Sequence, residues 1–122
     1  MFIKRLHDCA EFLAGDSTRL RELLHPDKEG IALRYSLAHA VVRPGDTSLR
    51  HRLATSEVYY ILDGEGLMRI GAEEARVGPG DTVYIPPRSI QCIENVGTKD
   101  LRFLCIVDPA WRAEDEVVEE AP

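Results

Sequence analysis

The sequence predicts an all-β domain, either a sandwich or a barrel, and two observations support this prediction. From residue 31 onward, turn-forming sequences recur at short and regular intervals, and their glycine and proline residues suit tight turns. The stretches between these turns have the length of strands, are rich in Val, Ile, Leu and Tyr, and show no helical periodicity beyond two turns. About eight short strands at this spacing are typical of a closed barrel or a sandwich.

The expected strands begin near residue 31 and end near Asp108, and a recognisable turn separates each from the next. The apolar stretches include IALRYSLAHAVV (31–42), EVYYIL (57–62), LMRI (67–70), DTVYI (81–85), IQCIEN (90–95) and LRFLCIV (101–107). The turns between them include RPGD (43–46), DGEG (63–66), GAEE (71–74), GPGD (78–81), IPPRS (85–89) and NVGTKD (95–100). We therefore assign residues 31–110 to the barrel.

Residues 1–30 are expected to form an N-terminal extension that packs on the barrel. Four residues have the spacing of one helical face, which predicts a short helix ended by Gly15: Leu6, Cys9, Ala10 and Leu13. The following stretch TRLRELL (18–24) could extend that helix or form an edge strand, and we favour a strand after residue 18.

Residues 111–122 are expected to form a disordered acidic tail. The net charge is −6, and the stretch EDEVVEEAP (114–122) holds acids but no base, so that the rest of the chain is nearly neutral. No basic stripe interleaved with aromatic residues is visible, so we expect no nucleic-acid partner. No apolar stretch approaches the ~20 residues that cross a membrane, and the first residues do not read as a secretion signal. We therefore expect a cytoplasmic protein without a membrane partner.

The three cysteines, Cys9, Cys92 and Cys105, are odd in number and share no close spacing. This pattern argues against a disulfide framework and against a C-x-x-C zinc site. We expect them to be free thiols in the core, where cysteine is common.

A histidine and a glutamate interrupt the stretch PGDTSLRHRLATSEVYYILDGEG (44–66). If His51 and Glu57 face the barrel interior, they are buried polar groups that need partners, and a divalent cation would serve both. The spacing of Gly45, His51, Glu57 and Gly64 resembles the first signature motif of the cupin superfamily, G-x5-H-x-H-x3-E-x6-G.

The later stretch GDTVYIPPRSIQCIEN (80–95) is similar to the second cupin motif, G-x5-P-x-G-x2-H-x3-N, with Gly80, Pro86 and Asn95 in place. The resemblance covers residues 31–108 and implies an antiparallel jelly-roll barrel, usually a homodimer. This chain departs from the motifs at three positions: Leu53 and Gln91 replace two ligand histidines, and Arg88 replaces a glycine.

Three interpretations of the site remain open. In the first, His51, Glu57 and Gln91 bind a divalent transition metal (zinc, manganese, nickel or iron), with water or another side chain completing the shell. His39, on the preceding strand, could supply a second nitrogen if it points inward. In the second, the same trio hydrogen-bonds a small ligand without metal. In the third, it is a buried network with no role beyond structure. We favour the metal site.

Further residues are candidates for the pocket wall. Tyr59 shares the face of Glu57, and Phe103 resembles a pocket-lining aromatic of small cupins, although either could equally be a core residue. Arg88 lies in a turn at the barrel end, where it could meet an anionic ligand, but a solvated side chain is the simpler interpretation.

The fold does not identify the chemistry. With one certain imidazole, oxygen activation is disfavoured, whereas isomerase- or lyase-like chemistry needs only a Lewis acid and an acid–base group such as Glu57 or Tyr59. The alternative is a non-catalytic protein that binds a small polar or sugar-like molecule. We also expect a homodimer, because Val58, Tyr60 and Leu62 would form an apolar row outside the barrel if Glu57 points inward.

Overall fold

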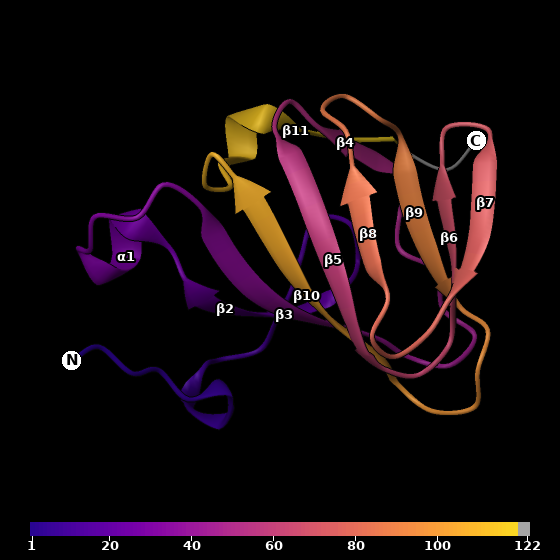
Figure 1. The fold of residues 1–122 in the computed structure, drawn as a ribbon, viewed down its shortest axis with the longest axis horizontal. Coiled ribbons are helices and arrows are strands. Elements are labelled where there is room, and N and C mark those ends of the chain that lie inside the picture. The colour runs from indigo at the N-terminus through magenta and orange to yellow at the C-terminus, as the bar shows by residue number, and fades with distance from the viewer. Residues whose placement is uncertain (120–122) are drawn as a thin grey trace.

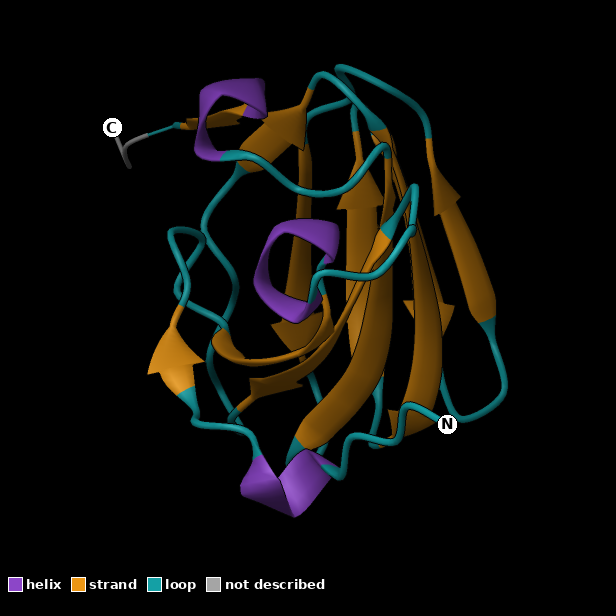
Figure 2. Ribbon diagram, turned by 90° about the vertical axis from the view of Figure 1, so that its left-hand side faces the viewer, coloured by secondary structure: helices purple, strands orange, loops and turns teal. Residues whose placement is uncertain are grey.

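The computed structural model describes residues 1–119 and shows two antiparallel β-sheets packed face to face as a jelly-roll barrel (Figures 1 and 2). Its strands are β1 (Phe12–Leu13), β2 (Arg19–Leu24), β3 (Ser36–Val42), β4 (His51–Leu53), β5 (Ser56–Asp63), β6 (Gly66–Ile70), β7 (Glu73–Val77), β8 (Thr82–Ile85), β9 (Gln91–Asn95), β10 (Leu101–Asp108) and β11 (Glu116–Val118). One sheet has the order β1-β2-β3-β10-β5-β8, and the other has the order β11-β4-β9-β6-β7. The predicted all-β jelly roll is confirmed.

Within residues 1–119, helical structure is limited to three short segments. These are the helix α1 (Pro26–Glu29) and the 3₁₀ turns η1 (Leu6–Asp8) and η2 (Ala113–Asp115). No helix within residues 1–119 is long and apolar enough to cross a membrane.

The core lies between the two sheets because apolar side chains alternate along the strands. In β10, alternate residues from Leu101 to Val107 are buried, and their neighbours are partly exposed. Ile61 of β5 and Ile93 of β9 meet Leu101 and Phe103 in this core, and all four are fully buried. The three cysteines are free and buried, as predicted.

The N-terminal region differs from the prediction. The strand expected after residue 18 is present as β2, but residues 6–13 form only η1 and the short strand β1 rather than a helix. β2 pairs with β3, so the six-stranded sheet begins well before residue 31. The helical spacing is misleading because β1 pairs with β2 in extended form, which leaves Leu13 on the surface.

The expected disordered tail is wrong for residues 111–119. β11 pairs in antiparallel fashion with β4, so that Val118 lies opposite His51. The acids of this segment are not left to repel one another, because Arg112 donates two hydrogen bonds to Asp115 and Glu119 lies near arginines of β4 and the preceding loop. Residues 120–122 of the predicted tail lie outside the described residues.

Two motif positions, Gly64 and Arg88, have a left-handed backbone. Gly64 has φ 88°, and a Cβ atom there would lie 2.7 Å from the carbonyl oxygen of Asp100. Only glycine avoids both the strained φ and this contact. Arg88, which replaces the second-motif glycine, also has a positive φ of 66°, and its side chain is exposed. This supports the solvated interpretation of Arg88.

We expect Gly64→Ala to destabilise the fold more than Gly71→Ala. Gly71 also has a positive φ, 59°, but nothing lies within 4 Å of the added Cβ atom. Gly71→Ala therefore costs only the backbone strain, about 1–2 kcal/mol. Gly64→Ala adds overpacking against Asp100 and Leu101, which costs about 1–3 kcal/mol more. Urea unfolding of the two variants measures the difference, and equal losses would contradict the steric argument.

Candidate functional site

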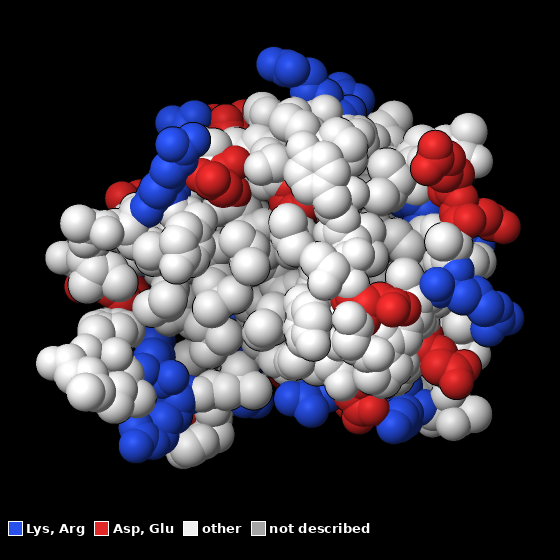
Figure 3. Space-filling model, in the orientation of Figure 1, with Lys and Arg blue, Asp and Glu red and all other residues white. Residues whose placement is uncertain are grey.

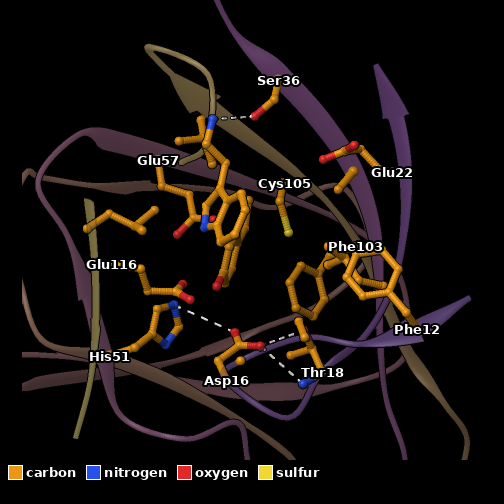
Figure 4. A pocket seen from close by; sticks show the side chains of 18 of the residues that line it. Phe12, Asp16, Thr18, Glu22, Ser36, His51, Glu57, Phe103, Cys105 and Glu116 are labelled. Atoms are coloured by element: carbon orange, nitrogen blue, oxygen red, sulfur yellow. Dashed lines mark hydrogen bonds and ion pairs between the residues drawn. The ribbon is translucent and has the colours of Figure 1, made fainter. Parts of the chain in front are cut away.

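A cavity of about 240 Å³ lies between the two sheets. Its inner wall comes from β3, β4, β5 and β10, and residues 12–16, Trp111 and Glu116 complete it from the two ends of the chain. Phe12 and Trp111 are partly exposed and mark the mouth. Figure 4 shows Asp16, Glu57 and Glu116 near His51 on one side, and the rings of Phe12 and Phe103 across from them.

His51 is the centre of the polar side of the cavity. It lies on β4 and is 2% exposed. Its Nδ1 lies 3.0 Å from the carbonyl oxygen of Leu49, which can only accept a hydrogen bond, so Nδ1 carries the proton. In the neutral ring, Nε2 therefore has a free lone pair, and it lies 3.6 Å from Oδ2 of Asp16.

Asp16 reaches the cavity through a tight turn that precedes β2. Its Oδ1 accepts hydrogen bonds from the backbone N–H and the hydroxyl of Thr18, at 3.1 and 2.7 Å. Ser17 between them has a left-handed backbone with φ 73°, a conformation that is costly for serine. This turn aims Oδ2 at His51. Sequence reasoning missed Asp16, although the Asp-x-Thr pattern is a turn signal.

Glu57 is buried on β5 and accepts a hydrogen bond from Nε2 of Gln91, at 2.7 Å. The pKa of Glu57 is raised to about 7, mainly by burial, and Asp16 and Glu116 act in the same direction. The Gln91 hydrogen bond and His51 oppose this increase. Glu57 therefore titrates near neutrality, which is unusual for a carboxyl group.

Glu116 lies on β11 and also lines the cavity. Burial raises its pKa, and Asp16 acts in the same direction, whereas His51 and the Trp111 side chain oppose the shift. Sequence reasoning missed Glu116 because it belongs to the acidic segment expected to be disordered. No local signal distinguishes it from the neighbouring acids.

The predicted aromatic residues both line the cavity. Tyr59 and Phe103 come from β5 and β10, and their ring centroids are 4.5 Å apart at an interplanar angle of 39°. Burial raises the pKa of Tyr59 well above its usual range, so its hydroxyl stays protonated.

His39 was expected to be a candidate ligand if it points inward, and it does not. On β3, Ala38 and Ala40 face the interior, and His39 lies on the opposite side, where its Nε2 accepts a hydrogen bond from Arg102. It is buried nonetheless, and burial lowers its pKa, with Arg102 and Arg21 acting in the same direction. The alternation of strand side chains places it outside the cavity.

The predicted metal-ligand set of His51, Glu57 and Gln91 does not assemble as expected. Gln91 directs its amide nitrogen, which is not a metal donor, to Glu57, and its Oε1 is buried without a partner. Leu53 of β4, where the motif has a histidine, is buried and contributes apolar surface to the cavity wall. Within residues 1–119, no group of three or more His, Cys, Asp or Glu side chains has an arrangement that could hold a metal ion. The donor set present therefore does not fit a metal.

Glu57→Gln should flatten the pH dependence of stability. Because the folded protein keeps a proton on Glu57 up to pH 7, whereas the unfolded chain loses it near pH 4.5, the wild-type free energy of unfolding falls as pH rises between these values. The fall is on the order of 3 kcal/mol. The glutamine retains an oxygen acceptor for Gln91 and does not ionise.

Urea unfolding at pH 5, 6, 7 and 8 tests this prediction. We expect the variant to be more stable than wild type at pH 8. Glu65→Gln, which replaces an exposed acid, is the matched control and should follow the wild-type curve. Parallel curves for Glu57→Gln and wild type would show that Glu57 is already ionised when buried.

Comparison with known proteins identifies the family. The family model for the cupin domain matches residues 38–107. An uncharacterized protein of Methanocaldococcus jannaschii is 42% identical over 111 residues, which is 89% of this chain and 87% of that protein. An oxalate-binding protein of Thermotoga maritima is 35% identical over 51 residues, 42% of each chain.

Solved structures share the fold. The structure of a predicted oxalate decarboxylase from Thermotoga maritima matches with a TM-score of 0.78 at 22% identity, over 88% of this chain and 99% of that one. The polyketide cyclase RemF from Streptomyces resistomycificus matches with a TM-score of 0.75 at 20% identity, over 94% and 89%. The family match spans more than half of the sequence, and the chain belongs to the cupin family.

Proposed function

We propose that the protein binds a small organic molecule in this cavity without the help of a metal ion. The observation behind the proposal is the hydrogen bond from Gln91 to Glu57, which uses the amide nitrogen at a position where a metal site needs an oxygen or a ring nitrogen. An enclosed cavity with apolar walls and a few convergent polar groups is the usual form of a small-molecule site.

The oxalate named for two similar proteins is a poor ligand for this cavity. Four carboxylic residues line it: Asp16, Glu22, Glu57 and Glu116. Among its described lining residues, Lys28 is the only lysine or arginine, and its Nζ lies 2.7 Å from Glu22. Without a metal ion, a dianion here would meet like charges. A neutral or positively charged molecule suits the lining better.

A proton-transfer activity is the second candidate, and the pKa of Glu57 favours it. A general acid or base works best when its pKa lies near the working pH, and Glu57 titrates at about 7. His51, with a free Nε2 facing the same cavity, could exchange a proton with the bound molecule. This pair suits an isomerase- or lyase-like reaction. Such an enzyme would lose turnover in Glu57→Gln while it still binds substrate.

The proposal predicts ligand binding by chelator-treated protein. We expect elemental analysis of the untreated protein to find no stoichiometric transition metal, and added zinc, manganese, nickel or iron to leave the melting temperature unchanged. A panel of small polar molecules, including sugars, amines and carboxylic acids, is then screened by thermal shift.

A cavity-filling variant tests where the ligands bind. Ala38→Phe fills the cavity from β3 and should abolish the thermal shifts, whereas Leu37→Phe, the next residue along β3, does not line the cavity and should retain them. Shifts that survive in Ala38→Phe would place binding elsewhere. If the protein carries a stoichiometric metal that His51→Ala loses and His7→Ala keeps, the metal-free proposal is wrong and the metal-site interpretation is supported.

We also propose that the protein is a homodimer that buries the outer face of the six-stranded sheet. Tyr60 and Leu62 of β5 and Tyr84 of β8 are exposed on this face. The apolar surface extends over neighbouring strands. Tyr60 lies opposite Leu104 of β10, and Tyr84 lies opposite Val58 of β5. Figure 3 shows the corresponding side of the molecule, where the central surface has few charged side chains. An apolar face of this kind is typical of an interface.

Sedimentation tests the dimer. We expect a species of about twice the chain mass of 13.7 kDa at micromolar concentration. Tyr60→Lys should shift it to the monomer, because a lysine at the centre of the apolar face would be buried without a partner. Tyr35→Lys changes a similarly exposed tyrosine outside the strands and should remain dimeric. A wild-type monomer would contradict the proposal.

A further inference from the structure

Three of the four carboxyl groups that line the cavity lack a lysine or arginine partner. The fourth, Glu22, pairs with Lys28, and outside the cavity Glu29 pairs with Lys4. In contrast, no lysine or arginine of residues 1–119 forms an ion pair with Asp16, Glu57 or Glu116, and their nearest basic group is the shared His51. When these carboxyl groups ionise, no lysine or arginine compensates their charge, and a bound cation would balance it.

Glu57 directs a free acceptor atom into the cavity. Its side chain is more than nine-tenths buried, and the hydrogen bond from Gln91 occupies Oε1 alone. The described residues provide no hydrogen-bond partner for Oε2. Figure 4 shows the carboxyl group of Glu57 turned toward Glu116 and His51. A buried carboxyl group with one free oxygen can form a hydrogen bond with a ligand, and it can ionise beside a positively charged one.

Aromatic side chains form much of the remaining wall. Phe12, Tyr59, Phe103 and Trp111 all line the cavity, and they come from separate parts of the chain. Trp111 is the single tryptophan of the sequence. Tyr59 and Phe103 lie deep in the barrel, whereas Phe12 and Trp111 lie at the mouth. The faces of aromatic rings are electronegative and attract cations, most strongly organic ammonium groups.

The position of Trp111 is set by two buried polar side chains. Its backbone N–H donates a hydrogen bond to Oγ of Ser36, at 2.9 Å. Its carbonyl oxygen accepts a hydrogen bond from Nε2 of His25, at 2.8 Å, because Nδ1 of His25 is already the acceptor for the N–H of Asp27. Ser36 and His25 are both buried. The backbone of Trp111 is therefore held at the mouth by both of its polar groups.

The geometry points to a small organic cation, an amine or a quaternary ammonium compound, as the ligand of this cavity. This inference rests on the proposed function and specifies its ligand class. Carboxylates on one side and aromatic faces on the other are the two groups that recognise an ammonium centre together. The volume of about 240 Å³ equals roughly eight water molecules, so the ligand is compact. A metal ion would gain nothing from the aromatic wall.

Choline and its uncharged isostere 3,3-dimethyl-1-butanol, in which carbon replaces the ammonium nitrogen, test the inference on chelator-treated full-length protein. The two probes have the same shape, so that a difference in affinity reports the charge. We expect choline to bind about tenfold more tightly by calorimetry, the size that a desolvated cation–π contact provides. Acetate should not bind.

Three variants identify the groups responsible. Glu116→Gln and Trp111→Leu should each reduce the preference for choline over the isostere, since they remove a charge and an aromatic face. Glu73→Gln removes an exposed acid on β7, outside the cavity, and should bind like wild type. Circular dichroism confirms that each variant is folded. Retention of the full preference in both cavity variants would overturn the inference.

The remaining outcomes separate the inference from the proposed function. Equal binding of choline and the isostere would overturn the cationic ligand but leave a metal-free small-molecule site. Binding of neither probe would also overturn the inference, and the Ala38→Phe screen then decides independently whether the cavity binds ligands. If zinc or manganese raises the melting temperature and displaces choline, both proposals fail and the cavity is a metal site.

Discussion

The hydrogen bond between Gln91 and Glu57 joins the two sheets across the interior of the barrel. Gln91 belongs to the five-stranded sheet and Glu57 to the six-stranded sheet, so this buried bond of 2.7 Å crosses from one sheet to the other. A buried carboxyl group without a donor would be costly, and the amide removes part of that cost. The bond uses the amide nitrogen of Gln91, and the amide oxygen is left buried without a hydrogen-bond partner.

Two further carboxyl groups of the cavity come from segments near the two ends of the chain. Asp16 comes from the turn before β2, and Glu116 from the strand that closes the five-stranded sheet beside β4. Both approach His51, which lies on β4 between these two contributions. Because neither segment belongs to the central strands of the barrel, the same scaffold can change the chemistry of its interior through its termini.

The central barrel could be predicted from the sequence, and the site could be predicted only in part. Turns at regular spacing and two motifs define strands locally, so the region from β3 to β10 needs no knowledge of the tertiary structure. His51 and Glu57 were found from the motif spacing, Phe103 from its resemblance to a pocket-lining aromatic of cupins, and Tyr59 because strand periodicity places it on the face of Glu57. The residue spacing of a motif does not report how a side-chain amide is rotated, and so it could not show that the nitrogen of Gln91 contacts Glu57.

Asp16 and Glu116 could not be found in the same way. Asp16 reaches the cavity through a left-handed residue, Ser17, in a turn whose direction depends on the pairing of β1 with β2. Glu116 belongs to a segment whose composition favours disorder, and only the pairing with β4 orders it. For Glu116 a contact between residues far apart in the sequence outweighs the local preference, whereas for Asp16 the local turn signal does not show which way the turn points.

Leu53 bears both on the missing metal ligand and on the pKa of Glu57. It is 4% exposed and places an apolar side chain in the wall that also contains His51 and Glu57. A histidine there would supply a nitrogen donor and could pair with the nearby carboxyl groups. Leucine does neither, and it adds apolar surface to the wall. Burial is the largest cause of the raised pKa of Glu57, and Leu53 belongs to the apolar lining of the same cavity. A single residue thus takes the place of a nitrogen donor in the motif and adds apolar surface to the cavity of a carboxyl group whose pKa depends on burial.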